Sequence, residues 1–343
     1  MPALADQDAP TRPGRRAWYR GLVRDEVGVT AVLLVIVFGV GIAHPDFLRT
    51  GNLMDTAHNS TYVGLMACGM VFPLAMREVD LSVGGMFAMC VVVGAVLIKH
   101  GVSPWLACAV ILVLSWLLGA VNGLVTTFMG IPSFIVTLAT SMLFRGVGLA
   151  MANGKQIGGL PYDHPLFTVV GGDVAGVPTA VWIFLAAVVG LTVLFTRSRY
   201  GARVRAIGSN PEAAEFTGLP IVVTRVLALS TSGLMAGLSA VLALAFFAAG
   251  DPTIGQGYEL TAIAAAIIGG TPLKGGRGSV VGAAVGTLIL GAVASALVFF
   301  QIPINWTTFA TGAVILVAVA ADASVRRLRA ARSTQPRTRT GEP

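Results

Sequence analysis

The sequence predicts an all-α integral membrane protein with about ten transmembrane helices, and three observations lead to this fold class. The 343 residues are 55% hydrophobic and only 11% charged, with a mean hydropathy of +0.81, whereas soluble domains carry about 25% charged residues. Apolar stretches able to cross a hydrocarbon core of roughly 30 Å recur from Val27 almost to the C-terminus. Basic residues gather in alternate connections between these stretches.

The predicted spans are apolar runs bounded by Gly, Pro, Asn and charged residues. In chain order they cover residues 27–43, 61–76, 81–98, 104–129, 131–152, 179–196, 226–248, 260–270, 280–300 and 307–321. The eighth is too short to cross the core comfortably. We therefore expect a re-entrant or broken helix there, which needs other protein or a water-filled cavity to satisfy its backbone.

The basic residues orient the chain, because Lys and Arg accumulate in cytoplasmic loops. With the N-terminus inside, the external segments hold Arg49, Lys99 and Lys155, and Arg145 lies within the fifth span. The internal segments hold Arg12, Arg15, Arg16, Arg20, Arg24, Arg77, Arg197, Arg199, Arg203, Arg205, Arg225, Lys274, Arg277, Arg326, Arg327, Arg329, Arg332, Arg337 and Arg339. An even number of spans also keeps the basic tail inside. Topology thus explains the net charge of +7, and no nucleic-acid partner is expected.

The expected organisation is a cytoplasmic N-terminal segment (1–26), a transmembrane domain (27–321) and a basic cytoplasmic tail (322–343). The longest internal connection covers residues 197–225, and a Gly- and Pro-rich external loop covers residues 153–177. The three cysteines, Cys68, Cys90 and Cys108, lie within spans without metal-ligand spacing. They are expected to be small apolar fillers.

The longest internal connection contains the signals of a short helix within GSNPEAAEFTGLP. Ser209 or Asn210 can cap its first turn, Pro211 suits the first helical position, and Glu212 complements the positive end of the helix dipole. Gly218 can adopt the left-handed conformation that ends a helix. A helix of about two turns is too short to be stable alone, so it packs either against this chain's own helices or against a partner protein.

Two short similarities suggest an internal repeat. GLMACGM at Gly64 resembles GLMAGLS at Gly233, and Asp80-Leu81-Ser82 resembles Glu259-Leu260-Thr261. Five spans in each half would make the second copy inverted, although chance similarity between Gly- and Ala-rich helices explains the matches equally well. Small-xxx-small pairs that allow close helix packing occur at Gly119/Gly123, Gly233/Gly237 and Gly282/Gly286.

The fifth span carries a polar stripe. Thr137, Ser141 and Arg145 are spaced four residues apart and share one helical face, with Thr140 and Phe144 beside it. An arginine inside a span normally faces a cavity or a partner. The stripe either lines a route for a polar solute, or Arg145 reaches the outer surface or neutralises a buried acid.

The stretch MREVDLSVGG places three ionisable residues between the second and third spans. One interpretation has Asp80 capping a helix that starts at Leu81, with Ser82 in its first turn and with Arg77 and Glu78 at the inner water interface. In the other, the turn dips into the membrane near an internal gate.

The sequence shows no sign of an enzyme. The glycine-rich stretch GGTPLKGGRGS has its lysine before the glycines and lacks the terminal Gly-Lys-Ser/Thr of a phosphate-binding P-loop. If ATP drives this protein, the nucleotide binds to another chain.

Three motifs together resemble the permease subunits of bacterial ribose/xylose-type sugar ABC transporters. They are GMVFPLAMREVDLSVGGMFA, NGLVTTFMGIPSFIVTLATSMLFRGVGLAM, and IGSNPEAAEFTGL with the later GYELTAIAAAIIGGTPLKGGRGSVVGAAVGTLIL. The resemblance covers about residues 27–321. It implies a multi-pass permease of the bacterial inner membrane that imports a monosaccharide by alternating access. Its implied partners are an ATPase subunit carrying ATP and Mg, a periplasmic sugar-binding protein, a second permease copy or paralogue, and membrane lipid. No cofactor is expected on this chain.

The resemblance also implies roles for particular residues. Those matching the family's ATPase-coupling helix are Asn210, Pro211, Glu212, Ala213, Ala214 and Gly218. The candidates for the solute pathway or its gate are Arg77, Glu78, Asp80, Ser82, Asn122, Phe134, Thr137, Thr140, Ser141, Phe144, Arg145 and Glu259. The common family form has two glycines where this chain has Arg77 and Glu78. That departure leaves open ribose, rhamnose, xylose, arabinose, galactose and a furanone signalling molecule as substrates.

A different class, the self-sufficient ion-coupled secondary transporter, is the alternative. Arg145, Asp80 and Glu259 would then form its ion-coupling site. The cytoplasmic helix favours the ABC permease, because a secondary transporter needs no docking element. A structural scaffold is disfavoured by the broken span and the arginine within a span.

Overall fold

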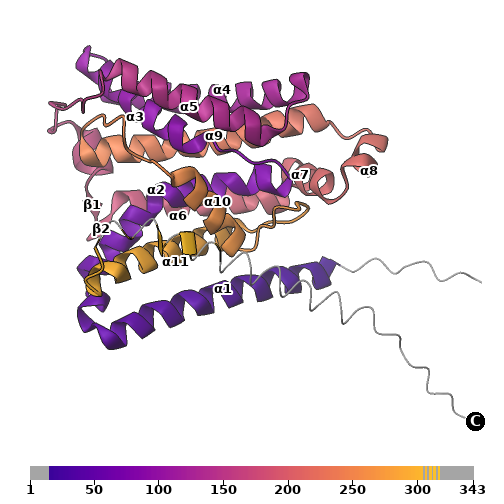
Figure 1. Ribbon diagram of the computed structural model, residues 1–343, viewed down its shortest axis with the longest axis horizontal. Coiled ribbons are helices and arrows are strands. Elements are labelled where there is room, and N and C mark those ends of the chain that lie inside the picture. Colours follow the sequence, from indigo (N-terminus) through magenta and orange to yellow (C-terminus); the bar gives the residue numbers. More distant parts are fainter. Residues whose placement is uncertain (1–14, 304–305, 307–308, 311, 314–315, 317–343) are drawn as a thin grey trace, which may run out of the picture.

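The computed structural model describes residues 15–303, 306, 309–310, 312–313 and 316, which form a bundle of long helices running roughly along one axis (Figure 1). The long helices are α1 (Arg15–Ala43), α2 (Thr50–Ala75), α3 (Val83–Lys99), α4 (Pro104–Met129), α5 (Ser133–Met151), α6 (Thr179–Arg197), α9 (Ile221–Phe247) and α11 (Val280–Phe299). The shorter elements are η1 (Pro45–Leu48), η2 (Leu166–Val170), β1 (Asp173–Val174), β2 (Val177–Pro178), α7 (Arg199–Ser209), α8 (Pro211–Phe216) and α10 (Tyr258–Ile268).

All the predicted spans except the tenth coincide with helices of the described part. Within it, six helices are long and apolar enough to cross a membrane: α1, α4, α5, α6, α9 and α11. The tenth predicted span, residues 307–321, lies almost wholly outside the described residues. The count of ten helices and the inverted five-helix repeat therefore remain predictions, while the all-α membrane character is confirmed.

The eighth predicted span is a short helix, as expected. α10 has 11 residues, which at 1.5 Å per residue is about 16 Å, roughly half of a hydrocarbon core. Gly255 and Gly257, just before it, adopt the left-handed conformation. α10 packs closely on α11, because a Cβ atom on Gly286 would collide with the Ala265 carbonyl. The neighbouring helix thus covers a span that is too short to cross by itself.

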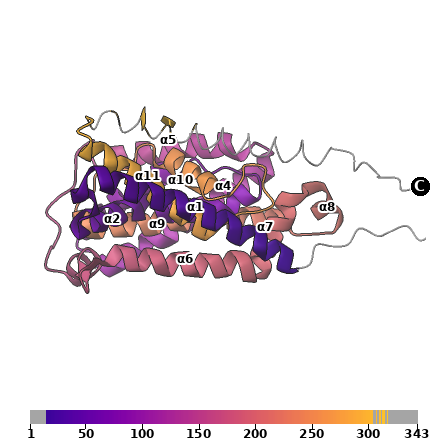
Figure 2. The same ribbon diagram turned by 90° about the horizontal axis from the view of Figure 1, so that it is seen from below.

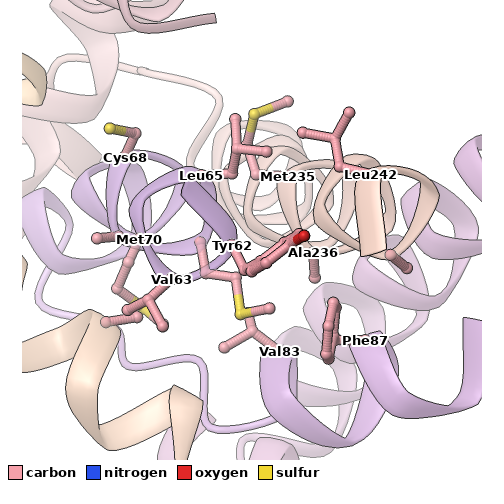
Figure 3. Close-up of a cluster of buried hydrophobic side chains, with 14 of the residues drawn as sticks. Tyr62, Val63, Leu65, Cys68, Met70, Val83, Phe87, Met235, Ala236 and Leu242 are labelled. Carbon is pink, nitrogen blue, oxygen red and sulfur yellow. The ribbon is translucent and has the colours of Figure 1, made fainter. Parts of the chain in front are cut away.

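The centre of the bundle is formed by α2, α3 and α9. Figure 3 shows side chains from these helices converging, among them Leu65 of α2, Phe87 of α3 and Met235 of α9. From Thr61 to Ala75 every residue of α2 is buried. Lipid tails are as apolar as leucine, so hydrophobicity alone does not hold such helices together and close packing has to do so.

The predicted small-residue pairs lie at close helix crossings. A Cβ atom on Gly119 of α4 would collide with the Leu229 carbonyl of α9, and one on Gly233 of α9 would stand 2.5 Å from the Ser115 carbonyl of α4. A Cβ atom on Gly282 of α11 would likewise collide with the carbonyl group that follows α10. The spacing seen in the sequence therefore marks real helix contacts.

We expect Gly119→Ala to destabilise the fold by about 1–3 kcal/mol, the usual cost of overpacking. The added methyl group would meet backbone of α9, which cannot yield without separating the two helices. Gly146→Ala on α5 is the control, because a Cβ atom there meets nothing within 4 Å. The midpoint of thermal unfolding in detergent measures both; equal midpoints would contradict the close approach of α4 and α9.

The two ends of the bundle differ. α7 and α8 project from one end, named here the α8 end, where α1 begins (Figure 1). The loop 269–279 joins this end, because Ser279 Oγ donates to Glu26 Oε1 of α1 at 2.7 Å. Figure 2 shows α8 extending beyond the other helices. The hairpin of β1 and β2 lies at the opposite end. Segments predicted to be internal thus share one end.

Candidate functional site

The turn between α2 and α3 begins with an arginine in a conformation that favours glycine. Arg77 has φ +67°. Its amide donates to the Leu74 carbonyl at 3.0 Å, and the Glu78 amide donates to the Pro73 carbonyl at 2.9 Å. This is the Schellman pattern, in which glycine usually occupies the left-handed position. A residue with a side chain costs about 1–2 kcal/mol there, so other contacts must offset that cost.

The side chain of Arg77 provides those contacts. Its Nε donates to the Gly208 carbonyl at 2.7 Å and its Nη2 to the Ser209 carbonyl at 2.9 Å. Both carbonyls belong to the last turn of α7, where a positive charge is favoured by the helix dipole. Hydrogen bonds from a charged donor are stronger than neutral ones. The strained position therefore attaches the end of α2 to the end of α7.

Glu78 forms an ion pair with the start of α9. Its Oε1 lies 2.7 Å from Arg225 Nε, with the Glu78 side chain 14% exposed and the Arg225 side chain 27% exposed. Arg225 Nη1 also reaches Thr127 Oγ1 of α4 at 3.5 Å. The sequence placed Arg77 and Glu78 together at the water interface. Arg77 is exposed there, whereas Glu78 is largely covered by its ion pair.

The next residues run extended along α5. Ser133 Oγ accepts from the Val79 amide at 3.0 Å, and Thr137 Oγ1 accepts from the Leu81 amide at 2.9 Å. The Thr137 hydroxyl has two acceptors within reach of its one proton, the Ser133 carbonyl at 2.8 Å and the Val79 carbonyl at 3.1 Å. Hydroxyl groups of α5 thus satisfy a backbone that makes no helical hydrogen bonds, as buried backbone requires.

A buried polar network follows. Asp80 and Ser82 are fully buried, and Asp80 Oδ1 accepts from the Ser82 amide at 2.9 Å and from the Ser82 hydroxyl at 2.6 Å. Asn122 of α4, also buried, donates from Nδ2 to Ser82 Oγ at 2.9 Å. The Ser232 hydroxyl of α9 lies close to the Asp80 carboxyl group. Asp80, Ser82 and Asn122, predicted separately as pathway candidates, are therefore one cluster.

The predicted capping role of Asp80 is wrong. α3 begins at Val83 with Ser82 as its N-cap residue, not at Leu81 with Asp80 as the cap. The Asp80 carboxyl group instead closes the turn that leads into the helix, by accepting from the Ser82 amide and hydroxyl.

The N-termini of α3 and α10 meet. A Cβ atom on Gly84 would collide with the Glu259 carboxylate and stand 3.0 Å from the Gly255 carbonyl. The rings of Phe87 and Tyr258 lie 5.6 Å apart between centroids. Glu259 Oε2 is buried and has no hydrogen-bond partner among the described residues. The two similar tripeptides noted in the sequence thus open helices whose positive dipole ends approach each other.

The polar stripe of α5 faces this meeting point. A Cβ atom on Gly85 of α3 would collide with the Ser141 carbonyl, and Arg145 Nη2 donates to the Gly255 carbonyl at 3.3 Å. Phe144 is buried beside them. The predicted sharing of one helical face is confirmed, and Arg145 binds backbone carbonyl oxygen. We call the place where the starts of α3 and α10 meet this face of α5 the central polar site.

Besides Arg77 and Glu78, two further predicted pathway residues lie apart from the central polar site. Phe134 is 51% exposed and points out of the bundle. Thr140 is partly exposed, and its hydroxyl donates to the Thr137 carbonyl of its own helix at 3.2 Å.

The predicted short helix is α8. Asn210 is its N-cap residue, with Oδ1 accepting from the Ala213 amide at 3.0 Å, which decides between the two cap candidates. Gly218 has φ +71°. Ala214 is buried, whereas Glu212 and Ala213 are exposed. The helix therefore rests on the chain through one side and presents the other to its surroundings.

The sequence reasoning missed two features at this end. α7 was not predicted, although Ser198 caps it by accepting from the Gly201 amide at 2.9 Å and Val204 and Ile207 form a buried face at helical spacing. That combination of a cap and a short apolar stripe was the available signal. Phe216, at the end of α8, is 93% exposed, and an aromatic side chain presented in this way is typical of a protein interface.

The described residues contain no group of three or more His, Cys, Asp or Glu side chains that could hold a metal ion.

Comparison with known proteins places these features in a family context. The family model for the permease component of branched-chain amino acid transport systems matches residues 52–319. The D-allose transport system permease protein of Escherichia coli (strain K12) is 34% identical over 300 residues, covering 87% of this chain and 91% of the relative. The ribose import permease protein of Bacillus subtilis (strain 168) is 34% identical over 308 residues, covering 90% of this chain and 95% of the relative. The L-arabinose transport system permease protein of Escherichia coli (strain K12) is 32% identical over 302 residues, covering 88% of this chain and 92% of the relative. No solved structure matches significantly.

Proposed function

Because this chain belongs to the membrane permeases of ABC transporters, among the sugar permeases of the ribose and xylose type, we propose that it imports a monosaccharide by alternating access. Two permease copies or paralogues form the path in the bacterial inner membrane, with the α8 end and both termini in the cytoplasm. A separate ATPase subunit binds ATP and Mg and supplies the energy. A periplasmic binding protein delivers the sugar.

The observation that carries this proposal is the central polar site. Two helices, α3 and α10, begin there from non-helical backbone, as happens at the substrate sites of many transporters. Hydrogen-bonding groups of Ser82, Ser141 and Glu259 lie at or next to this site. Sugar hydroxyls can exchange hydrogen bonds with such groups. The polar groups are few, which suits a pathway that must release its solute while the binding protein supplies the affinity.

Among substrates, the family relatives favour a monosaccharide. The similar proteins are named for D-allose, ribose and L-arabinose, which comprise a hexose and two pentoses. We propose a sugar of this size, a pentose, hexose, deoxyhexose or related furanone.

The α8 helix is the proposed contact for the ATPase. Its exposed side carries Glu212 and Phe216, and the helix extends beyond the other helices at this end (Figure 2). The helix starts at the coupling residues Asn210 and Pro211 and is followed by Gly218 in the left-handed conformation. The other coupling residues, Ala213 and Ala214, lie on its exposed and its buried side. Nucleotide-driven closure of two ATPase subunits would move this helix, and the spans would rearrange as rigid bodies.

Uptake in proteoliposomes tests the proposal. Vesicles containing this chain, its ATPase and its binding protein should accumulate radiolabelled ribose, allose or arabinose only when ATP is enclosed with the ATPase. Omitting the ATPase or the binding protein, or replacing ATP with a non-hydrolysable analogue, should stop uptake. Uptake by this chain alone, driven by an ion gradient, would support the ion-coupled alternative and refute the proposal.

A further inference from the structure

The two charged residues of the α2–α3 turn reach opposite flanks of α8. Arg77 donates to the Gly208 and Ser209 carbonyls at 2.7 and 2.9 Å, immediately before the N-cap of α8. Glu78 pairs with Arg225 at 2.7 Å, shortly after α8 ends. Consecutive residues of one turn therefore hold both ends of the segment that contains α8.

The contacts around this attachment are tight. A Cβ atom on Gly208 would collide with the Ala75 carbonyl, and one on Gly275 would stand 2.6 Å from Arg77 Cγ. The Gly276 amide donates to the Ala75 carbonyl at 2.8 Å. The end of α7, the end of α2 and the loop before α11 are thus in direct contact. A displacement of α8 that moves the end of α7 would therefore press on the turn.

The turn leads without interruption to the central polar site. Its next residues are bound to α5 through the Ser133 and Thr137 hydroxyls, and the Asp80–Ser82 network then opens α3. One residue into α3, Gly84 faces Glu259. Each step is a hydrogen bond or a packed contact, which gives a continuous physical path between the two regions.

We infer that Arg77 and Glu78 are positioning residues that transmit the movement of α8 to the start of α3 and so couple the ATPase to the central polar site. This inference rests on the proposed function, in which α8 binds the ATPase. Neither residue contacts sugar or nucleotide; Arg77 acts through α7 and Glu78 through α9.

The first test is Arg77→Gly in the complete complex with ATPase and binding protein. Glycine adopts φ +67° without strain, so the variant should unfold at an unchanged temperature and co-purify with the ATPase. The number of sugar molecules transported per ATP hydrolysed should fall about tenfold, within the usual range of coupling between sites. An unchanged ratio overturns the inference. So does loss of ATPase co-purification, because Arg77 would then hold α8 in place rather than transmit its movement.

The second test exchanges the charges of the ion pair. Glu78→Arg and Arg225→Glu should each lower the transport-to-hydrolysis ratio, and the double variant should restore it, as a double-mutant cycle requires for a direct interaction. A double variant no better than the single ones overturns the inference. The matched control exchanges Asp46 and Arg49, an ion pair at the opposite end with exposed side chains; it should leave the ratio unchanged.

Failure of this inference and failure of the proposed function are distinguishable. The unmodified complex is measured first, and absence of ATP-dependent uptake there refutes the proposed function. If the unmodified complex transports sugar and the variants keep its ratio, only the link through Arg77 and Glu78 is refuted.

Discussion

Replacing Phe216 with alanine should weaken binding of the ATPase to this chain by about 30-fold or more, the consequence of losing an aromatic hot spot worth at least about 2 kcal/mol. Phe216 is 93% exposed at the tip of α8, and its ring makes no contact that the fold needs. Its exposure is unfavourable in water unless a partner covers it. Titration of the purified permease with the ATPase, followed by fluorescence anisotropy, gives the dissociation constant.

Tyr162→Ala provides the matched control for Phe216→Ala. Tyr162 is an exposed aromatic residue, 61% accessible, in the loop at the opposite end of the bundle, so its loss should leave ATPase binding unchanged. The double variant Glu212→Lys with Ala213→Arg should weaken binding from the neighbouring exposed positions. If Phe216→Ala and Tyr162→Ala bind the ATPase equally well, α8 is not the docking element.

Asp80→Ala should lower the free energy of unfolding by about 2–6 kcal/mol, because two buried donors on Ser82 lose their acceptor and each unsatisfied group costs about 1–3 kcal/mol. The donors are the Ser82 amide and hydroxyl, both bonded to Asp80 Oδ1. Sugar uptake should be lost as well, since this network sets where α3 begins. Thermal unfolding in detergent and uptake in proteoliposomes measure the two effects.

Asp80→Asn separates hydrogen bonding from charge. The asparagine oxygen can accept both Ser82 bonds, and its amide can donate to the neighbouring Ser232 hydroxyl of α9. This variant should therefore unfold near the unmodified temperature. An asparagine variant as unstable as the alanine variant would contradict the hydrogen-bonding account. Loss of uptake in a stable asparagine variant would show that transport uses the carboxyl group itself.

Local signals in the sequence predicted much of the fold. The span of residues 104–129 matches α4 in full, because Pro104 starts it and Gly130, in the left-handed conformation, ends it. The α8 helix was predicted for the same reason, since Asn210, Pro211 and Gly218 act within a few residues of one another. Helix α7 escaped prediction because its apolar face is short and its surface is rich in arginine.

The candidate site was predictable as a set of residues and not as an arrangement. Helical periodicity correctly placed Thr137, Ser141 and Arg145 on one face. Nothing in their spacing indicated that Thr137 would hold the extended backbone before α3, or that Arg145 would reach Gly255, which is 110 residues away in the chain. Asp80 was assigned to a cap because the local pattern fits one, and α5 overrode that pattern.

The sequence by itself determined that this chain lies in a membrane. It also determined at which residues most of its helices begin and end, and which family the chain resembles. Those properties depend on the length of apolar runs and on caps, which act over a single helix. Only the tertiary structure decided the partners of Arg77 and Glu78 and the meeting of α3 with α10. Such contacts join residues more than a hundred positions apart, as the bond from Arg77 to Gly208 does across 131. Helix packing selects them, and no local pattern encodes that choice.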